Sequence, residues 1–337
     1  MNKGIIIAGN MLVDHVKMCD NYPTPGMLTN VRVVDKGVGG CVCNTAADIA
    51  IIDPEINVAA IGMVGRDADG DYIKEVMSGL GIDIEGVITT DDSFTSFSDV
   101  MSDLSTNERT FFHGRGANAL FGPEHINVDS LNADIFHIGY ALLLDKFDEP
   151  DDMYGTVMAR TLAEVSAKGI KTSIDVVSEA SDRFTRVVAP CLPHCDYLIF
   201  NEVEASLVTG ISVRDADGKI KQNGIKDVIA ALFEMGVREV VCIHAPEGGW
   251  YARRDDTVYY LPSLNLTKDM IKGKVGAGDA FCAGMLYSLY KEFDPEYSLR
   301  VAGAAAGCNL TEKNSIDGLR QFDKMMEFES EIGYPTV

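Results

Sequence analysis

The sequence Gly276-Ala277-Gly278-Asp279-Ala280-Phe281 runs directly into the apolar stretch Cys282-Ala283-Gly284-Met285-Leu286. Small residues that lead into a helix leave its first N–H groups free to point at an anion, and the helix dipole adds to the attraction. Asp279 lies among these donors, where its charge would repel a phosphate. A lone carboxylate there suits a base that deprotonates an attacking hydroxyl. The stretch therefore predicts phosphoryl transfer from a nucleotide to an alcohol, unless Asp279 is only a first-turn residue of a glycine-capped helix.

Two other segments carry polar side chains at expected helix starts. Gly37-Val38-Gly39-Gly40 precedes a helix in which Asn44 falls one turn inside, and its amide can both donate to and accept from hydroxyls. Asn201 follows the apolar strand Tyr197–Phe200, and Glu204 lies three residues later on the same helix face. Side chains with oxygen ligands hold hydrated Mg²⁺, although the same pair also fits an N-cap with its capping box.

These segments, in this order and spacing, resemble the ribokinase (PfkB) family of carbohydrate kinases. Gly39-Gly40 with Asn44 matches the first family motif, the Asn201–Glu204 pair matches Asn-x-x-Glu, and Gly276–Asp279 matches Gly-Ala-Gly-Asp. Smaller similarities fall at residues 9–14, 62–70 and 108–118. The resemblance covers roughly residues 3–318 and implies a kinase that uses ATP and Mg²⁺.

The resemblance implies a role for each of these residues. Asp279 is expected to be the base, beside an anion hole formed by the backbone of Gly276, Ala277 and Gly278. Glu204 and Asn201 are expected to position Mg²⁺, and the residues expected to contact ATP are Asn201, Lys274 and Gly248. Substrate hydroxyls are expected to meet a larger set: Asp14, Gly39, Gly40, Asn44, Asn118 and Arg109, with Arg115 as an alternative to Arg109.

The chain departs from the family pattern close to the expected base. Family members often carry an Asp three residues before Gly-Ala-Gly, where it commonly helps to bind a monovalent cation; here that position is Gly273. The next position is usually Thr and here is Lys274, whose ammonium group can stand in for the missing ion. The chain is therefore expected to show little activation by K⁺. The Asn and Arg that often follow Asp175 in sugar kinases are also missing, and Ile243-His244-Ala245 replaces the usual Thr-x-Gly, so the acceptor is less defined than the reaction.

Strand-like and helix-like segments alternate along most of the chain, which implies parallel strands with right-handed crossovers. Strands are expected at residues 4–8, 58–64, 135–138, 171–176, 197–200 and 239–243, and helices at 44–52, 70–80, 153–168, 202–209, 225–234, 277–290 and 297–310. Residues 11–36 and 93–114 lack helical periodicity and predict a small β lid, the second segment as a hairpin. We therefore predict one α/β domain over residues 1–337, a ribokinase-like three-layer αβα sandwich with a mostly parallel central sheet and this lid. Its ligands should lie beyond the carboxyl ends of the strands.

Composition limits the partners that the chain can bind. It has 337 residues, 46% of them hydrophobic, and a net charge of −22, which argues against nucleic acid and anionic membranes. The chain lacks an apolar run long enough to span a bilayer and enters the strand Ile5–Ile7 at once, so a cytoplasmic protein is expected. Eight cysteines without a C-x-x-C pair are expected to be reduced and buried. Cys41 and Cys43 fit packing residues, and the cluster of Cys191, His194 and Cys195 lacks a second ligand pair for zinc.

Three functions remain open at this stage. The leading one is a sugar kinase that phosphorylates a terminal CH₂OH group. The second is a nucleoside kinase of the same fold, in which lid phenylalanines stack on a base: Phe94, Phe97, Phe111 and Phe112. The third is a catalytically silent protein that binds a sugar or a nucleotide, which the presence of Asp279 argues against. The apolar residues of the lid also make a lid-to-lid homodimer plausible.

Overall fold

The isoleucines of β1 (Ile5–Gly9) are buried inside a large sheet. Successive side chains of a strand point to opposite faces. Ile5 and Ile7 belong to one hydrophobic core, whereas Ile6 and Ala8 belong to a second core on the other face. A strand covered on both faces is apolar at every position, which explains the unbroken apolar run near the N-terminus.

The computed structural model describes residues 3–106, 108–179, 181–254 and 257–335. Within these residues the main sheet has nine strands in the order β15-β14-β13-β12-β11-β8-β1-β4-β5. Besides β1, its strands are β4 (Val58–Gly65), β5 (Asp83–Thr90), β8 (Ile135–Ala141), β11 (Lys171–Val176), β12 (Tyr197–Asn201), β13 (Val240–Ala245), β14 (Gly248–Arg253) and β15 (Tyr259–Pro262). The strands from β5 to β13 pair in parallel, which confirms the mostly parallel sheet.

One edge of the main sheet was not anticipated. β14 pairs antiparallel with β13, and β15 pairs antiparallel with β14. Only Pro246 and Glu247 connect β13 to β14. A two-residue connection can close a hairpin, but a crossover to a parallel strand needs a dozen or more residues. The expectation of uniform strand–helix alternation was therefore wrong at this edge.

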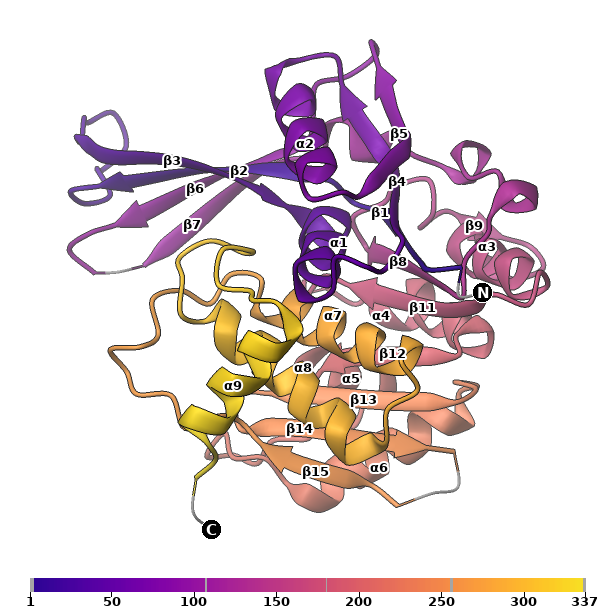
Figure 1. The fold of residues 1–337 in the computed structure, drawn as a ribbon. Coiled ribbons are helices and arrows are strands. Elements are labelled where there is room, and N and C mark those ends of the chain that lie inside the picture. The colour runs from indigo at the N-terminus through magenta and orange to yellow at the C-terminus, as the bar shows by residue number, and fades with distance from the viewer. Residues whose placement is uncertain (1–2, 107, 180, 255–256, 336–337) are drawn as a thin grey trace.

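Helices cover both faces of the main sheet (Figure 1), so the three-layer αβα sandwich is confirmed. One face carries α1 (Gly40–Ile52), α2 (Ala68–Gly79), α7 (Ala277–Tyr290), α8 (Pro295–Asn309) and α9 (Phe322–Ile332). The other face carries α3 (Val157–Ser166), α4 (Phe184–Val187), α5 (Glu202–Thr209) and α6 (Gln222–Glu234). In the described part of the chain, none of these helices has the length and hydrophobicity that crossing a bilayer requires.

Two helices begin four residues away from their expected starts. α1 begins at Gly40, one turn before the predicted Asn44. α3 begins at Val157 rather than at residue 153, because Pro150–Asp151 (β9) and Gly155–Thr156 (β10) pair as a short hairpin. The hydroxyl of Thr156 then caps α3 by accepting from the backbone N–H of Ala159 at 3.1 Å.

Helices α7 and α8 pack very closely. A Cβ atom added at Gly284 would lie 2.8 Å from the Cα atom of Ala302, so only glycine allows this approach. The small residues of both helices thus bring α7 against its neighbours and fix where its N-terminal end points.

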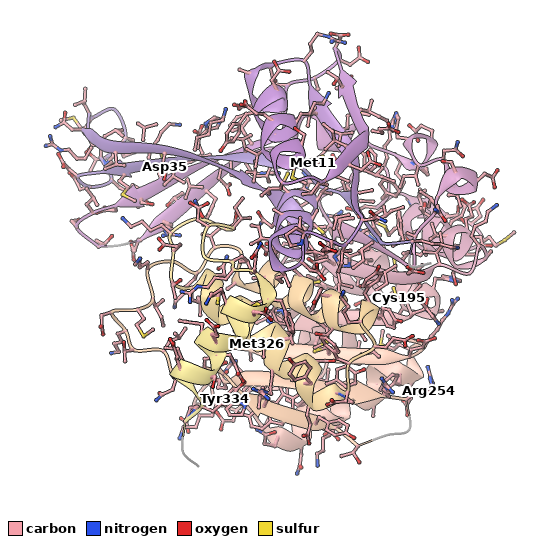
Figure 2. All side chains as sticks on the ribbon, viewed as in Figure 1. Met11, Asp35, Cys195, Arg254, Met326 and Tyr334 are labelled. Carbon is pink, nitrogen blue, oxygen red and sulfur yellow. The ribbon has the colours of Figure 1, made fainter. Side chains whose placement is uncertain are left out.

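A separate small sheet of four strands projects from the main body (Figure 1). Its strands are β2 (Leu12–Cys19), β3 (Val31–Gly39), β6 (Phe97–Asp103) and β7 (Arg109–Gly114), in the order β3-β2-β6-β7. Figure 2 labels Asp35 on this projection. Asp69 of α2 accepts from His15 Nε2 and pairs with Lys36 Nζ, both at 2.7 Å, and so ties the small sheet to the body. These strands confirm the small sheet expected from the segments 11–36 and 93–114.

Candidate active site

The N-terminal end of α7 has a backbone that only glycine adopts easily. Gly276 has a φ of 78°, in the left-handed region, and a Cβ atom there would lie 2.7 Å from the Cβ atom of Ser315. The helix begins at the next residue, Ala277. The N–H groups of a first helical turn have no acceptor inside the helix, so Ala277, Gly278 and Asp279 present donors at this end of α7.

Asp279 lies in this first turn and receives hydrogen bonds from two neutral side chains. Asn44 Nδ2 donates to Oδ2 at 2.8 Å, and the hydroxyl of Tyr140 donates to Oδ1 at 2.6 Å. Burial raises the pKa of the Asp279 carboxyl, and the hydrogen bonds from Tyr140 and Asn44 oppose that rise in pKa. Two donors thus orient the carboxyl group, and it forms no ion pair with a cationic side chain among the described residues.

Tyr140 is a residue of this cluster that the sequence analysis missed. It follows Gly139 near the carboxyl end of β8, the edge at which open α/β sheets bind ligands. A polar aromatic side chain near the carboxyl end of a mostly apolar strand is the signal that could have identified it.

The first glycine-rich segment lies opposite Asp279. Gly39 is the N-cap of α1, and a Cβ atom there would lie 2.7 Å from Oδ2 of Asp14. Gly40 has a φ of 87°, and a Cβ atom there would lie 2.5 Å from the side-chain oxygen of Asn10. One turn later, Asn44 directs its amide nitrogen at Asp279, while its buried Oδ1 has no hydrogen-bond partner among the described residues.

Asn201 and Glu204 form the capping box that their spacing allowed. Asn201 Oδ1 accepts from the backbone N–H of Glu204 at 2.9 Å, and Glu204 Oε2 accepts from the backbone N–H of Asn201 at 3.0 Å. Ser178 joins them: its hydroxyl donates to Glu204 Oε1 at 2.6 Å and accepts from Asn201 Nδ2 at 2.9 Å. Burial raises the pKa of Glu204 to about 7, against the hydrogen bonds from Ser178 and Asn201. Both carboxylate oxygens are therefore engaged, so Mg²⁺ held here would be reached through water.

A cleft of about 620 Å³ gathers most of the predicted residues. Those that line it are Asp14, Gly40, Asn44, Arg109, Asn201, Glu204, Lys274, Gly276, Gly278 and Asp279. Tyr140, Asp175 and Ser178, which lacked a predicted site role, line it as well. The main sheet, α1, α5, α7 and the small sheet thus meet at one cleft.

Two predicted residues lie in different surroundings. Asn118 is fully buried. Its Oδ1 accepts from the backbone N–H of Met11 at 3.1 Å, and its Nδ2 donates to the backbone carbonyl of Met11 at 3.0 Å. Figure 2 labels Met11. Gly248 lies at the β13–β14 turn, where a Cβ atom would be 2.3 Å from the carbonyl oxygen of Leu261. Their contacts with substrate and nucleotide stay predictions.

The two arginines near the small sheet, Arg109 and Arg115, have different surroundings. Arg109 of β7 is exposed and lines the cleft. Arg115 instead donates to Asp145 at 2.7 Å and to the carbonyl of Leu142 at 3.3 Å. Arg109 is therefore the one of the two that is available to a ligand in the cleft.

Gly273 occupies a position with no space for a side chain. A Cβ atom there would lie 2.6 Å from the carbonyl oxygen of Glu312 and 2.9 Å from that of Lys313. An aspartate cannot occupy this backbone unless the turn at Glu312–Lys313 moves. The adjacent Lys274 is exposed and lines the cleft.

The cleft is rich in acid. Burial and the charge of Asp279 raise the pKa of Asp14 to about 6. Burial, followed by the charges of Asp279 and Glu204, also raises the pKa of Asp175. Each of these carboxylates thus disfavours ionisation of its neighbours. A polyphosphate that enters this acidic cleft needs cations to offset the repulsion between negative charges.

Comparison with known proteins gives one family. The family model described as pfkB family carbohydrate kinase matches residues 2–321. The ribokinase of Haemophilus influenzae is 21% identical over 97% of this chain and 99% of its own length. The nucleoside kinase of Methanothermobacter thermautotrophicus is 23% identical over 99% of this chain and 98% of its own. The ATP-dependent ribose-1-phosphate kinase of Halopiger xanaduensis is 25% identical over 89% of each chain.

Solved structures share the fold. Arabidopsis thaliana ribokinase, complexed with ribose and ATP, has a TM-score of 0.80 and 21% identity, over 97% of this chain and 98% of that one. The nucleoside kinase of Methanocaldococcus jannaschii has a TM-score of 0.75 and 19% identity, over 98% of this chain and 100% of that one. A structure from Escherichia coli that contains ATP and Mg²⁺ has a TM-score of 0.77 and 18% identity, over 98% and 100%.

Proposed function

Because the chain belongs to the pfkB family of carbohydrate kinases, and is thus a phosphotransferase with an alcohol acceptor, we propose a specific reaction for it. The enzyme transfers the γ-phosphoryl group of ATP to a hydroxyl of a small carbohydrate, a terminal CH₂OH group, with Asp279 as the general base. The observation that carries this proposal is the Asp279 carboxylate, held by Asn44 and Tyr140 at the start of α7.

The start of α7 supports both halves of the reaction. The N–H groups of Gly278 and Asp279 provide donors for the negative charge of the transferring phosphoryl group, while that of Ala277 makes a long bond of 3.5 Å to the carbonyl of Lys274. The Asp279 carboxylate, in the first turn of the same helix, takes the proton from the acceptor hydroxyl. Fixing both groups on one helix end aligns the acceptor with the phosphoryl group.

Polar groups across the cleft support a sugar as the acceptor. The buried Asn44 Oδ1 lacks a partner among the described residues, and a buried acceptor without a donor is unfavourable. A sugar hydroxyl can satisfy it. Asp14 and Arg109 line the same cleft and offer an acceptor and a donor to further hydroxyls.

The acidic cleft supports a metal ion bound with ATP. Asn201, Ser178 and Glu204 offer oxygens, and Glu204 is the anion of this set. These residues would hold hydrated Mg²⁺, which neutralises phosphate charge when it is bound. Lys274 also lines the cleft and adds a fixed positive charge to it.

A nucleoside acceptor is the second candidate, and Phe111 is the observation that favours it. Its ring lines the cleft and is 58% exposed, which suits stacking on a base. Phe94 and Phe97 instead pack on each other, with ring centroids 5.6 Å apart. Of these three residues, Phe111 is thus the one whose ring is available to a base in the cleft.

The small sheet supports a lid and a homodimer as parts of this proposal. Val34 and Phe112 are 72% and 60% exposed, and a second copy of the chain would cover such apolar residues. Light scattering should give a dimer for the wild type and a monomer for the V34K/F112S double variant; a monomeric wild type contradicts the dimer alone. All eight cysteines are buried and free, which supports a cytoplasmic enzyme.

The proposed reaction is tested with a panel of acceptors. Sugars, sugar acids and nucleosides are each incubated with ATP and Mg²⁺, and ADP release is measured with the rate without acceptor as the control. The proposal expects a sugar to give the highest kcat/KM. A higher value for nucleosides supports the second candidate, and tight ligand binding without ADP release identifies a silent binding protein.

A further inference from the structure

A cluster of buried metal-ligating side chains lies directly below the cleft. Cys41, His137 and Asp175 each offer one ligand atom, and these three atoms lie within 4.8 Å of one another. The three residues come from α1, β8 and β11, which are far apart in the sequence. Of the residues that the structure describes, these three form the group that could hold a metal ion.

A fourth ligand adjoins this group. Cys282 Sγ lies 3.8 Å from His137 Nε2, and Cys282 follows Asp279 by three residues on α7. The other ring nitrogen of His137, Nδ1, lies 2.9 Å from the hydroxyl of Ser173. Metal-binding histidines usually hold their second nitrogen in this way, which fixes the orientation of the ring. His137 therefore turns Nε2 toward a sulfur while Ser173 holds its other side.

We propose that Cys41, His137, Asp175 and Cys282 form a binding site for Zn²⁺. Two sulfurs, one imidazole and one carboxylate are the ligand types that zinc prefers, in a tetrahedral arrangement. Zinc–ligand bonds of about 2.0–2.3 Å require neighbouring ligand atoms to lie roughly 3.3–3.8 Å apart. The ligand atoms of Cys41, His137 and Asp175 lie within 4.8 Å of one another, and Cys282 Sγ lies 3.8 Å from His137 Nε2, so a bound ion would draw these groups inward.

The ion has a route to the site and replaces protons on arrival. Asp175 and Cys282 line the cleft, so Zn²⁺ can enter from it. Burial raises the pKa of both thiols and of Asp175, which favours their protonated forms. Zinc binds thiolates and carboxylates, so its binding releases protons and supplies a positive charge that compensates the buried anions.

The site adjoins the residues that orient the proposed base. A Cβ atom added at Gly139 would lie 2.8 Å from the Cβ atom of Asp175 and 2.9 Å from Cys41 Sγ. The next residue is Tyr140, which donates to Asp279. Drawing Cys41 and Asp175 toward a metal shifts this backbone, so Zn²⁺ inhibits the proposed kinase. Only the inhibition depends on the proposed function; the binding does not.

The test uses Co²⁺ as a spectroscopic replacement for Zn²⁺, on the full chain and without nucleotide. The wild type should bind one Co²⁺ per chain with a thiolate-to-cobalt absorption band, and Zn²⁺ should abolish that band. Cys41→Ala and Cys282→Ala each keep one thiolate, so each should weaken the band and the double variant C41A/C282A should abolish it. The matched control Cys191→Ala, another buried cysteine, should retain the full band. Ser173→Ala should weaken binding by about 10–100-fold, the usual effect of losing such a second partner.

Two results overturn the proposal. One is a wild type that binds no Co²⁺ through thiolate, and the other is a band that keeps its full intensity in both Cys41→Ala and Cys282→Ala. Circular dichroism shows whether each variant is folded, and Asp175→Asn replaces any cysteine variant that is not. Inhibition of ADP release by Zn²⁺ is then compared between the wild type and Cys41→Ala. Because cobalt binding needs no turnover, a chain without kinase activity still decides this proposal.

Discussion

Asn44 Nδ2 lies 2.8 Å from Asp279 Oδ2, although 235 residues separate them in the chain. This hydrogen bond joins α1 to the start of α7 and holds the carboxylate toward the cleft. Tyr140 holds the other oxygen at 2.6 Å. Three segments from different parts of the chain must therefore fold together before the proposed base is oriented.

Replacing the proposed base should abolish most of the turnover. We expect Asp279→Asn to fold and to bind ATP, but to lower kcat by about 10²–10⁴, the usual share of a general base. ADP release and nucleotide binding measure the two properties, with the exposed Asp152→Asn as the matched control. A variant with near wild-type kcat shows that Asp279 only begins a helix.

Removing the tyrosine donor should change the pH dependence. Tyr140→Phe loses a hydrogen bond to the Asp279 carboxylate and so raises the pKa of this group. The base must be ionised to work, so the variant should lose activity first at low pH. We expect a loss of about tenfold at the acid end, because a hydrogen bond to a charged group contributes about 1.5–3 kcal/mol, and a smaller loss at pH 8. A profile of kcat/KM against pH that matches that of the control Tyr154→Phe rejects this role.

Neutralising Glu204 should raise the Mg²⁺ requirement. Glu204→Gln keeps a capping side chain but removes the anion, and we expect about 10–100-fold more Mg²⁺ for half-maximal rate, as for other groups that act on a metal through one intervening ligand. Asn201→Ala should weaken the use of Mg–ATP without unfolding the chain. The exposed Glu234→Gln is the control, because it neutralises a carboxylate that does not line the cleft. Mg²⁺ curves that overlay the wild type for both variants assign Asn201 and Glu204 to helix capping alone.

The glycine at position 273 predicts that the rate of the enzyme depends only weakly on K⁺. Without a carboxylate there, an incoming K⁺ lacks a strong oxygen ligand, and Lys274 supplies a fixed charge beside the anion hole. We expect Lys274→Met to lower kcat/KM for ATP by about tenfold or more, because a hydrogen bond from a charged group contributes about 1.5–3 kcal/mol. Rates in Tris or tetramethylammonium buffer, with and without K⁺, test this, with the exposed Lys268→Met as control. Strong activation of the wild type by K⁺, or an unaffected Lys274→Met, contradicts it.

Asp48 should make the fold less stable as the pH rises. It is fully buried on α1, and neither carboxyl oxygen has a partner among the described residues. Burial, with the charge of Asp279, raises its pKa well above the usual value of 3.8. Above that value the unfolded chain loses this proton while the folded chain keeps it, so rising pH favours unfolding.

Asp48→Asn has no titratable group at this position. Its stability relative to the wild type should therefore increase as the pH rises. With an unfolding entropy of about 2.1 cal/mol/K per residue, about 1 kcal/mol changes the Tm of this 337-residue chain by about 1.4 °C, so we expect a gain of about 1–2 °C at pH 8. At pH 4 the difference should be smaller. Thermal unfolding across this range, with Asp152→Asn as control, checks the sign; a difference that shrinks with pH refutes it.

The bounds of α7 could be predicted from the sequence because the residues that mark its start lie next to one another in the chain. The glycines before Ala277 and the apolar run after it mark a helix start, and the observed bounds 277–290 agree with the expected ones. Tyr140 was missed because its contact with Asp279 depends on which strands become neighbours. The same limit applies to Asn118, whose hydrogen bonds reach Met11 across 107 residues. Motif spacing indicated which residues share the cleft, whereas their hydrogen-bond partners depended on the tertiary fold.

The contact of Gly273 with the carbonyls of Glu312 and Lys313 also constrains how this chain can evolve. A single codon change that introduced aspartate would meet backbone, because its Cβ atom would lie 2.6 Å from a carbonyl oxygen. A carboxylate at this position and the shape of a turn some forty residues away are therefore linked characters. A variant that gains the acid must also remodel the turn, so the two positions should change together.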